Sequence, residues 1–398
     1  MKVVICGAGI AGLALANRLS ARGDEVVVVE RAPGPRGQGY MIDFFGPGYD
    51  AAEAMGLLPA IGARAYAIER ASFVDETGRE RASIHTPAVA SGRLLSIMRP
   101  DLEEVLREAL PDDVDLRYGT RLTGVDDTGD RVTVELDDTS VEADLLVGAD
   151  GVHSAVRAAV FGPEERFLHD LGLHTAAFSF DDPEIHAEVA GRFCLTDTVD
   201  RQMGFYGLRD GRVAAFAVHR PADPRLPAEP RPAIREAYRG LGWVVPQALR
   251  ACPAEDIYYD QVAQIRMPSW SSGRVVLLGD ACYAVSLLAG QGASLAISGA
   301  YVLADRLARS TSVPEALADY ERLWRPVVEE KQQTGRSAAR WFLPGSKLQL
   351  HFRRATLALA KLPVLNRYVT ARLAGKSTGL ITSLRAAERE SSPIPAGE

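Results

Sequence analysis

The stretch that most constrains the fold is residues 4–31, VICGAGIAGLALANRLSARGDEVVVVER. A short β-branched run at residues 2–6 predicts a strand, and the apolar side chains of residues 13–22 recur at helical spacing. A second apolar run, residues 25–30, predicts another strand. Between the first strand and the helix stand three glycines in G-x-G-x-x-G spacing: Gly7, Gly9 and Gly12. This order of strand, glycine turn, helix and strand is typical of a dinucleotide-binding unit.

Each glycine of this motif has its own physical reason. Gly7 permits a tight turn, Gly9 lets the backbone approach a pyrophosphate, and Gly12 lets helix and strand pack closely. The N-terminus of the helix adds unpaired N–H groups and the positive end of its dipole. Glu30, 18 residues after Gly12, can accept hydrogen bonds from ribose hydroxyls and disfavours a 2′-phosphate. The alternative to a dinucleotide site is a strand–helix–strand unit that binds no ligand. A secretory signal is a further alternative, and the glycine turn argues against it.

Bulk composition excludes several classes of protein. The chain has 398 residues, enough for two or three packed units, with 47% hydrophobic and 24% charged residues. A net charge of −7 argues against a general nucleic-acid binder. The cysteines are scattered without metal-ligand spacing, which predicts no metal site and reduced thiols in a cytoplasmic protein. They are Cys6, Cys194, Cys252 and Cys282.

One long uncharged stretch, residues 281–304, has the length of a transmembrane helix. Its glycines and Gln291, and the strand that leads into it, predict instead a buried loop followed by a helix. We therefore expect no transmembrane segment.

The pattern changes after residue 166, where alternating apolar and polar positions replace helical spacing. This alternation predicts four strands of an antiparallel sheet, at residues 175–180, 188–195, 202–207 and 213–220. The fold class is therefore α/β: a Rossmann-like dinucleotide-binding domain with an inserted antiparallel-sheet substrate domain and a C-terminal helical segment. We expect a discontinuous cofactor domain of residues 1–70, 95–166 and 266–340, a substrate domain of residues 71–94 and 167–265, and a helical segment of residues 341–398.

The tail is basic. Residues 341–390 contain nine Lys or Arg and two acids, together with many leucines. We expect a pair of amphipathic helices packed on the body, with frayed residues 391–398. The alternative is a surface that contacts a membrane or a substrate-carrying protein.

Two further glycine-bearing motifs follow buried strands. One is GADGVHSAVR at residues 148–157, and the other is GDACYAVSLLAGQGASLA at residues 279–296. In order and spacing, the three motifs together resemble the group A FAD-dependent aromatic monooxygenases. These are the p-hydroxybenzoate-hydroxylase-like enzymes, which include phenol, polyketide and tetracycline hydroxylases. The resemblance covers roughly residues 1–340.

The resemblance implies FAD as cofactor, held at both ends. The first motif and Glu30 take the ADP half, and Asp280 accepts a hydrogen bond from the ribityl chain. The N–H groups near Gly290 and Gly292 approach the flavin, where the helix dipole favours the anionic reduced form. The expected cofactor-binding residues are Gly7, Gly9, Gly12, Glu30, Arg31, Arg36, Arg99, Asp150, Asp280, Gly290, Gly292 and Ala293. Arg157 either braces the turn at Asp150 or touches ligand.

The chain departs from the family pattern at two positions of the third motif. Tyr283 stands where the family commonly has His, and Leu287 where it has Pro. The resemblance places Leu287, Gly290 and Gly292 beside the isoalloxazine, and no catalytic side chain is assigned. For the substrate, we expect a pocket between the flavin and the antiparallel sheet. Its candidate residues are His169, His174, Phe178, Phe193, Met203, Phe205, Tyr206, Phe216 and His219.

The function implied by the resemblance is monooxygenation. NAD(P)H reduces FAD, O₂ adds at flavin C4a, and the hydroperoxide transfers one oxygen atom to an aromatic or polycyclic natural product. Hydroxylation is the first expectation, with epoxidation or Baeyer–Villiger oxidation on the same intermediate. The alternatives are a non-redox FAD-containing cyclase, a binding protein without flavin, and a flavin reductase of isoprenoid lipids. The expected protein is a monomer or dimer.

Overall fold

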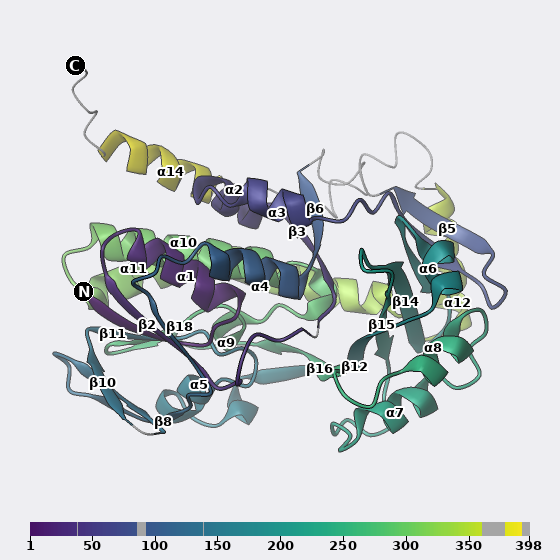
Figure 1. Ribbon diagram of the computed structural model, residues 1–398, viewed down its shortest axis with the longest axis horizontal. Coiled ribbons are helices and arrows are strands. Elements are labelled where there is room, and N and C mark those ends of the chain that lie inside the picture. The colour runs from purple at the N-terminus through teal and green to yellow at the C-terminus, as the bar shows by residue number, and fades with distance from the viewer. Residues whose placement is uncertain (38, 86–92, 138, 360–378, 392–398) are drawn as a thin grey trace.

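The computed structural model describes residues 1–37, 39–85, 93–137, 139–359 and 379–391. Two layered parts lie side by side along the long axis of the molecule (Figure 1). The part that carries the N-terminus is built on a parallel sheet, and the other part on a larger, mostly antiparallel sheet. This architecture confirms the expected fold class.

The parallel sheet has six strands in the order β17-β18-β11-β1-β2-β7. All neighbouring strands are parallel except β17 and β18. β7, at the edge beside β2, and the two-residue β17 were not predicted. The strands are β1 (Lys2–Cys6), β2 (Glu25–Glu30), β7 (Asp115–Tyr118), β11 (Leu145–Gly148), β17 (Ser271–Ser272) and β18 (Val275–Leu277).

Helices cover one face of this sheet and a small second sheet covers the other (Figure 1). The helices are α1 (Ile10–Ser20), α4 (Arg99–Glu108), α10 (Gly292–Arg309) and α11 (Val313–Phe342). The second sheet has β8 (Leu122–Asp127), β9 (Val132–Leu136) and β10 (Ser140–Ala143). α10 is buried over most of its length. No helix in the described ranges has the length and apolarity needed to cross a membrane.

The larger sheet has seven strands in the order β16-β12-β15-β14-β13-β4-β5. Its neighbours are antiparallel except β13 and β4, which pair in parallel. The strands are β4 (Arg70–Val74), β5 (Glu80–His85), β12 (Leu168–Phe180), β13 (Arg192–Thr196), β14 (Arg201–Gly207), β15 (Val213–His219) and β16 (Tyr258–Ile265).

The strand expected at residues 188–195 is wrong in its first part. Residues there complete helix α6 (Pro183–Val189), and β13 begins only at Arg192. Pro183 occupies the first helical turn, and the Asp182 carboxylate accepts a hydrogen bond of 3.0 Å from the Ile185 amide. A proline after a capping aspartate begins a helix, and this local signal overrides the apolar alternation.

The two faces of the seven-stranded sheet have different neighbours. One face packs against α6, α7 (Pro230–Ala237) and α8 (Val245–Ala251). The other contacts a two-stranded sheet of β3 (Met41–Phe45) and β6 (Leu94–Met98), which belongs to the first part. Helices α2 (Pro47–Ala54) and α3 (Leu58–Arg64) follow β3. This second face therefore meets the side of the molecule that carries the glycine motifs.

The C-terminal helices α12 (Lys347–Leu359) and α14 (Leu380–Ser391) pack on the body, as expected. α12 is anchored by Arg353, and α14 by the buried Ile381 and Leu384. Leu348 and Phe352 on α12 nevertheless remain 80% and 71% exposed. Several tail residues lie outside the described ranges: Lys361, Leu362, Leu365, Arg367, Tyr368, Arg372, Leu373, Lys376 and residues 392–398.

Candidate cofactor site

A cavity of about 850 Å³ lies at the carboxyl edge of the parallel sheet. The parallel strands β1, β2, β11 and β18 end at this edge, so the segments that follow them converge there although they are far apart in the sequence. All the expected cofactor-binding residues line the cavity except Gly12, together with Leu287. The cavity therefore brings the three glycine motifs together.

The first motif needs its glycines for different reasons. Gly7 has φ +111°, and a Cβ there would lie 2.4 Å from the Ala149 carbonyl oxygen. Gly12 packs behind the turn, where a Cβ would lie 1.9 Å from the Gly7 carbonyl oxygen, so only glycine fits there. Around Gly9 the nearest atom, a Glu103 carboxylate oxygen, would be 3.6 Å away. Because no side chain caps α1, its first N–H groups are free to bind a phosphate.

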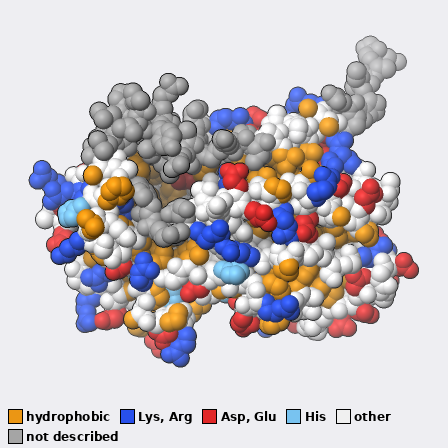
Figure 2. Space-filling view, turned by 180° about the vertical axis from the view of Figure 1, so that it is seen from behind, with side chains coloured by type: hydrophobic (Ala, Val, Ile, Leu, Met, Phe, Trp, Pro, Cys, Tyr) orange, Lys and Arg blue, Asp and Glu red, His pale blue; other side chains and the backbone are white. Residues whose placement is uncertain are grey.

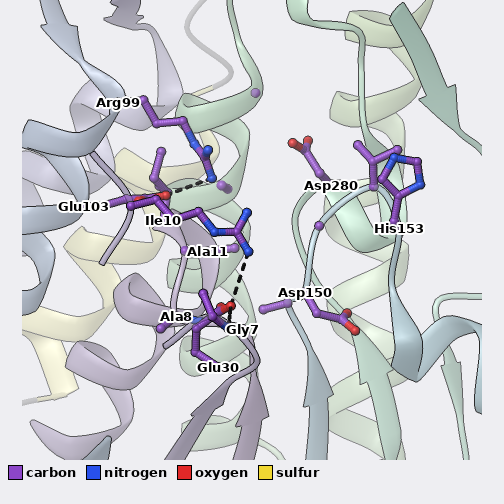
Figure 3. Close-up of a pocket in the computed structure, with 18 of the residues that line it drawn as sticks. Gly7, Ala8, Ile10, Ala11, Glu30, Arg99, Glu103, Asp150, His153 and Asp280 are labelled. Carbon is purple, nitrogen blue, oxygen red and sulfur yellow. Dashed lines mark hydrogen bonds and ion pairs between the residues drawn. The ribbon is translucent and has the colours of Figure 1, made fainter. Parts of the chain in front are cut away.

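Glu30 ends β2 beside the first motif. Its carboxylate accepts hydrogen bonds from the amides of Ala8 (3.1 Å) and Ala32 (2.9 Å). Arg36 approaches the same carboxylate at 3.4 Å, the ion pair drawn in Figure 3. Glu30 therefore fixes the turn of the glycine motif, and Arg31 and Arg36 line the cavity beside it.

Arg99 begins α4 and points toward the middle of the cavity (Figure 3). Its guanidinium forms an ion pair of 2.9 Å with Glu103, one helical turn further along. Burial raises the pKa of Glu103, and the charge of Arg99 offsets part of that rise. The pair places a positively charged group opposite Asp280.

Asp150 in the second motif caps helix α5 (Ala155–Val160). Its carboxylate accepts hydrogen bonds from the Ser154 hydroxyl (2.5 Å) and from the amides of Ala155 (2.7 Å) and Val156 (3.1 Å). Burial raises the pKa of Asp150, and these hydrogen bonds oppose the rise. Asp150 is thus held at the cavity wall by the helix that it caps.

Arg157 lies in the core and does not line the cavity. It donates hydrogen bonds to the carbonyl oxygens of Ala281 (2.8 Å) and Val152 (2.6 Å). Of the two interpretations of Arg157, the structure supports the bracing one, since the side chain ties the second motif to the third.

His153 lines the cavity, and no role was predicted for it. Its ring nitrogens lie 3.0 Å from Glu164 and 3.4 Å from Asp260. The hydrogen bonds to Asp260 and then Glu164 raise the pKa of His153 to about 9, so the ring is cationic at neutral pH. In the described part of the chain, no cluster of His, Cys, Asp or Glu could hold a metal ion.

The third motif closes the cavity. Gly279 has φ +64°, and Asp280 follows it at the start of α9 (Asp280–Tyr283), open to the cavity. Burial by the surrounding protein raises the pKa of Asp280, and Arg99 opposes this. Leu287, in the 3₁₀ turn η4 (Leu287–Ala289), also lines the cavity. The N-terminus of α10 has no side-chain cap, so the N–H groups at Gly292 and Ala293 are available to a ligand.

Tyr283, the second departure from the family pattern, points away from the cavity. It is buried, its hydroxyl accepts a hydrogen bond of 3.2 Å from Tyr320, and its ring lies 5.0 Å from the Trp270 ring. This departure therefore changes the core behind the motif, whereas Leu287 changes the cavity lining itself.

The nine candidate substrate residues separate by sheet face. Phe178, Met203 and Phe205 pack in the core toward α7 and α8. His174 and His219 are also buried, and burial lowers the pKa of His219 to about 4. His169 is exposed. The residues on the face that meets the first part are Phe193, Tyr206 and Phe216.

Two aromatic residues were missed by sequence reasoning. Tyr40 and Tyr258 line the cavity with their ring centres 5.4 Å apart, and the Phe216 ring lies 5.8 Å from Tyr40. Tyr258 and Asp260 share one face of β16 by the two-residue period of a strand. This two-residue alternation is visible in the sequence. It identifies residues that face the cavity only when the neighbouring strand in the sheet is known.

Comparisons with known proteins agree with this geometry. The family model described as FAD binding domain matches residues 1–334. An uncharacterised protein of Mycobacterium tuberculosis (strain H37Rv) is 37% identical over 343 residues, which are 83% of this chain and 91% of that protein. A flavin-dependent monooxygenase of Legionella longbeachae is 30% identical over 347 residues, 84% of this chain and 88% of the relative. The crystal structure of tetracycline destructase Tet(55) matches with a TM-score of 0.79 and 28% identity, covering 93% of this chain and 97% of that one.

Proposed function

The chain belongs to the FAD binding domain family of flavin-dependent monooxygenases, and from this premise we propose that it uses NAD(P)H and O₂ to hydroxylate an aromatic or polycyclic small molecule. The observation that carries the proposal is the cavity itself. Three glycine motifs converge on it, and two uncapped helix N-termini, those of α1 and α10, open into it. An elongated dinucleotide with a negatively charged centre fits such a site.

In this proposal the two ends of the cavity hold the two ends of FAD. Glu30 accepts hydrogen bonds from the adenosine ribose, and the N–H groups of α1 bind the pyrophosphate. Asp280 accepts a hydrogen bond from the ribityl chain, and the N-terminus of α10 stabilises negative charge on the isoalloxazine. When bound, FAD supplies the hydride and oxygen chemistry, and the protein binds, orients and shields it.

The aromatic surroundings support the proposed substrate class. Tyr40 and Tyr258 line the cavity, and Phe216 of the seven-stranded sheet packs beside Tyr40. Such rings can pack against a flat aromatic ligand. Tet(55), which shares 28% identity with the chain, is by its name a tetracycline destructase, and tetracycline is a polycyclic compound.

A non-redox cyclase on the same fold is the second candidate. Leu287 in the cavity lining favours it, because the family pattern has Pro there. Tyr283 no longer does, since its side chain lies in the core. A reductase of isoprenoid lipids stays a third alternative, whereas family membership argues against a flavin-free binding protein.

The test is to purify the protein, record its visible spectrum, and follow NADPH and NADH oxidation with O₂ uptake against a panel of polycyclic phenols. We expect a yellow protein, a rate of NAD(P)H oxidation that rises with at least one phenol, and a product with one added oxygen atom. A yellow protein whose oxidation rate no compound changes, but which isomerises or cyclises a substrate, would support the cyclase instead.

A further inference from the structure

We propose that Asp43 recognises a hydroxyl group of the aromatic substrate, by accepting a hydrogen bond from it in a recess between β3 and the seven-stranded sheet. The inference rests on the proposed function, because it assumes an aromatic substrate that carries a hydroxyl. It adds a binding residue that the three glycine motifs do not contain.

The two faces of strand β3 have different surroundings. Tyr40, just before the strand, and Ile42 line the large cavity. Because side chains alternate along a strand, Met41 and Asp43 project from the opposite face. Met41 packs there beside Tyr206 of the seven-stranded sheet, and Asp43 is exposed while the adjacent Phe44 is fully buried. Asp43 therefore points into the space on the far side of β3.

The walls of this recess are apolar. Met41, Met98, Tyr206 and the partly exposed Phe193 and Phe216 form one cluster. Figure 2 shows hydrophobic side chains on the half of the molecule that carries the seven-stranded sheet. An aromatic ligand could bury apolar surface against these side chains.

The recess continues toward the expected flavin. Phe216 and Leu288, the residue after Leu287 of the cavity lining, pack against the same buried cluster of Leu173, Val218, Val262 and Leu343. Phe216 and Leu288 are both partly exposed, so their surfaces are open to a ligand. A ring that lies along this wall reaches from the η4 turn to the strand that carries Asp43.

Within the part of the chain that the structure describes, the Asp43 carboxylate has one hydrogen-bond partner, and its Oδ2 accepts no hydrogen bond. The hydroxyl of Ser96, opposite in the β3–β6 register, donates to Oδ1 of Asp43 at 2.7 Å. Among the described residues, no Lys, Arg or His contributes to the pKa shift of Asp43. Burial raises the pKa of Asp43, and the Ser96 hydrogen bond opposes the rise. A carboxylate beside apolar side chains and without a nearby cation gains most from a donor brought by the ligand.

The experiment titrates the FAD-loaded protein with matched pairs of polycyclic phenols and their methyl ethers, and follows the flavin absorbance. The ether has the same apolar body but cannot donate. A hydrogen bond to a charged group corresponds to a preference for the phenol of about 10- to 100-fold. We expect wild type to show this preference, Asp43→Asn to lower it to a few-fold, and Asp43→Leu to abolish it while ether binding is retained.

The control is Asp112→Asn, a change of an exposed acid on the surface, which should keep the wild-type preference. The FAD content of each variant reports whether it is folded. If Asp43→Leu loses FAD, the isosteric variant Asp43→Asn carries the test. An equal preference in wild type and Asp43→Asn, or no preference in wild type, would overturn the inference alone. A matched amine that depends on Asp43 more than the phenol does would overturn the hydroxyl assignment. A spectrum that no phenol perturbs would overturn the proposed substrate class and the inference together.

Discussion

At the scale of single residues, the carboxylate of Glu30 contributes both to the fold and to the proposed cofactor site. It holds the glycine turn through the amides of Ala8 and Ala32, and in the proposed cofactor site it also binds the ribose. Glu30→Gln keeps the size but removes the charge and replaces one of the two acceptor oxygens by an NH₂ donor, so one backbone hydrogen bond is lost and the other weakens. We expect FAD affinity to fall by about 10- to 100-fold, the range for hydrogen bonds to a charged group. Quenching of FAD fluorescence on titration with apoprotein measures the dissociation constant.

The matched control is Glu25→Gln at the other end of the same strand. Glu25 is exposed and pairs with Lys2 on the surface, so FAD affinity should not change. Wild-type affinity in Glu30→Gln would show that the ribose is held elsewhere.

The stability of the folded protein should depend on pH through His153, and the acidic partners of the ring determine the direction of this dependence. Its pKa is about 9 in the folded protein, against about 6.5 for an unperturbed His. A base whose pKa is raised by folding contributes stability that is present below pH 6.5 and is lost as the pH rises through 9. Asp260→Asn removes the main cause, so the pKa of His153 should fall toward the unperturbed value.

NMR titration of the His153 ring protons measures this shift directly. Glu165→Gln is the control, because Glu165 is exposed and neighbours Glu164 in sequence without contacting the ring. A pKa near 9 in Asp260→Asn would mean that Glu164 alone sets the charge of the ring.

At the scale of elements, sequence reasoning succeeded where the signal was local. β1, β2 and the loop followed by a helix in residues 281–304 were predicted, because glycines and apolar runs mark these segments. β7 was missed because a four-residue edge strand with polar side chains has no clear alternation. α6 was assigned partly to a strand because the apolar pattern was weighed above the Asp182-Pro183 cap.

The anchoring of α12 depends on a buried ion pair. The Asp197 side chain is 1% exposed and accepts hydrogen bonds from Arg353 (2.6 Å) and Arg354 (2.5 Å). Asp197→Ala leaves two guanidinium groups without their anion, and loss of one partner of a buried pair typically costs about 3–5 kcal/mol. We expect a lower melting temperature and faster amide hydrogen exchange in α12.

The control here is Asp223→Ala. Asp223 pairs with Arg225 at 2.6 Å on the surface, where both side chains are more than half exposed. An exposed pair contributes little to the free energy of unfolding, so exchange in α12 should stay as in wild type. Unchanged exchange in Asp197→Ala would show that apolar packing alone holds the helix.

At the scale of the whole molecule, the meeting of three motifs at one cavity followed from their order after parallel strands. The other residues of the cavity wall could not be predicted from the sequence. Tyr40, Tyr258 and His153 reach the cavity through tertiary contacts that no local pattern encodes. The same holds for the candidate substrate residues. Alternation along β14 and β15 divides them into two sets, but only the position of α7 and α8 shows which set is core.

A ligand that spans this cavity should stabilise the molecule as a whole. Its walls come from residues 6–42, 99–122, 149–155, 258–263 and 280–296, so bound FAD contacts segments from both parts of the fold. A ligand that binds only the folded state adds about 2.7 kcal/mol when its concentration is 100 times the dissociation constant. We expect the melting temperature to rise by several degrees with FAD in scanning calorimetry, in a single transition. At the same FAD concentration Glu30→Gln should show a smaller rise, since its affinity is lower. Two transitions, of which FAD moves only one, would show that the seven-stranded sheet unfolds independently and contributes nothing to holding the cofactor.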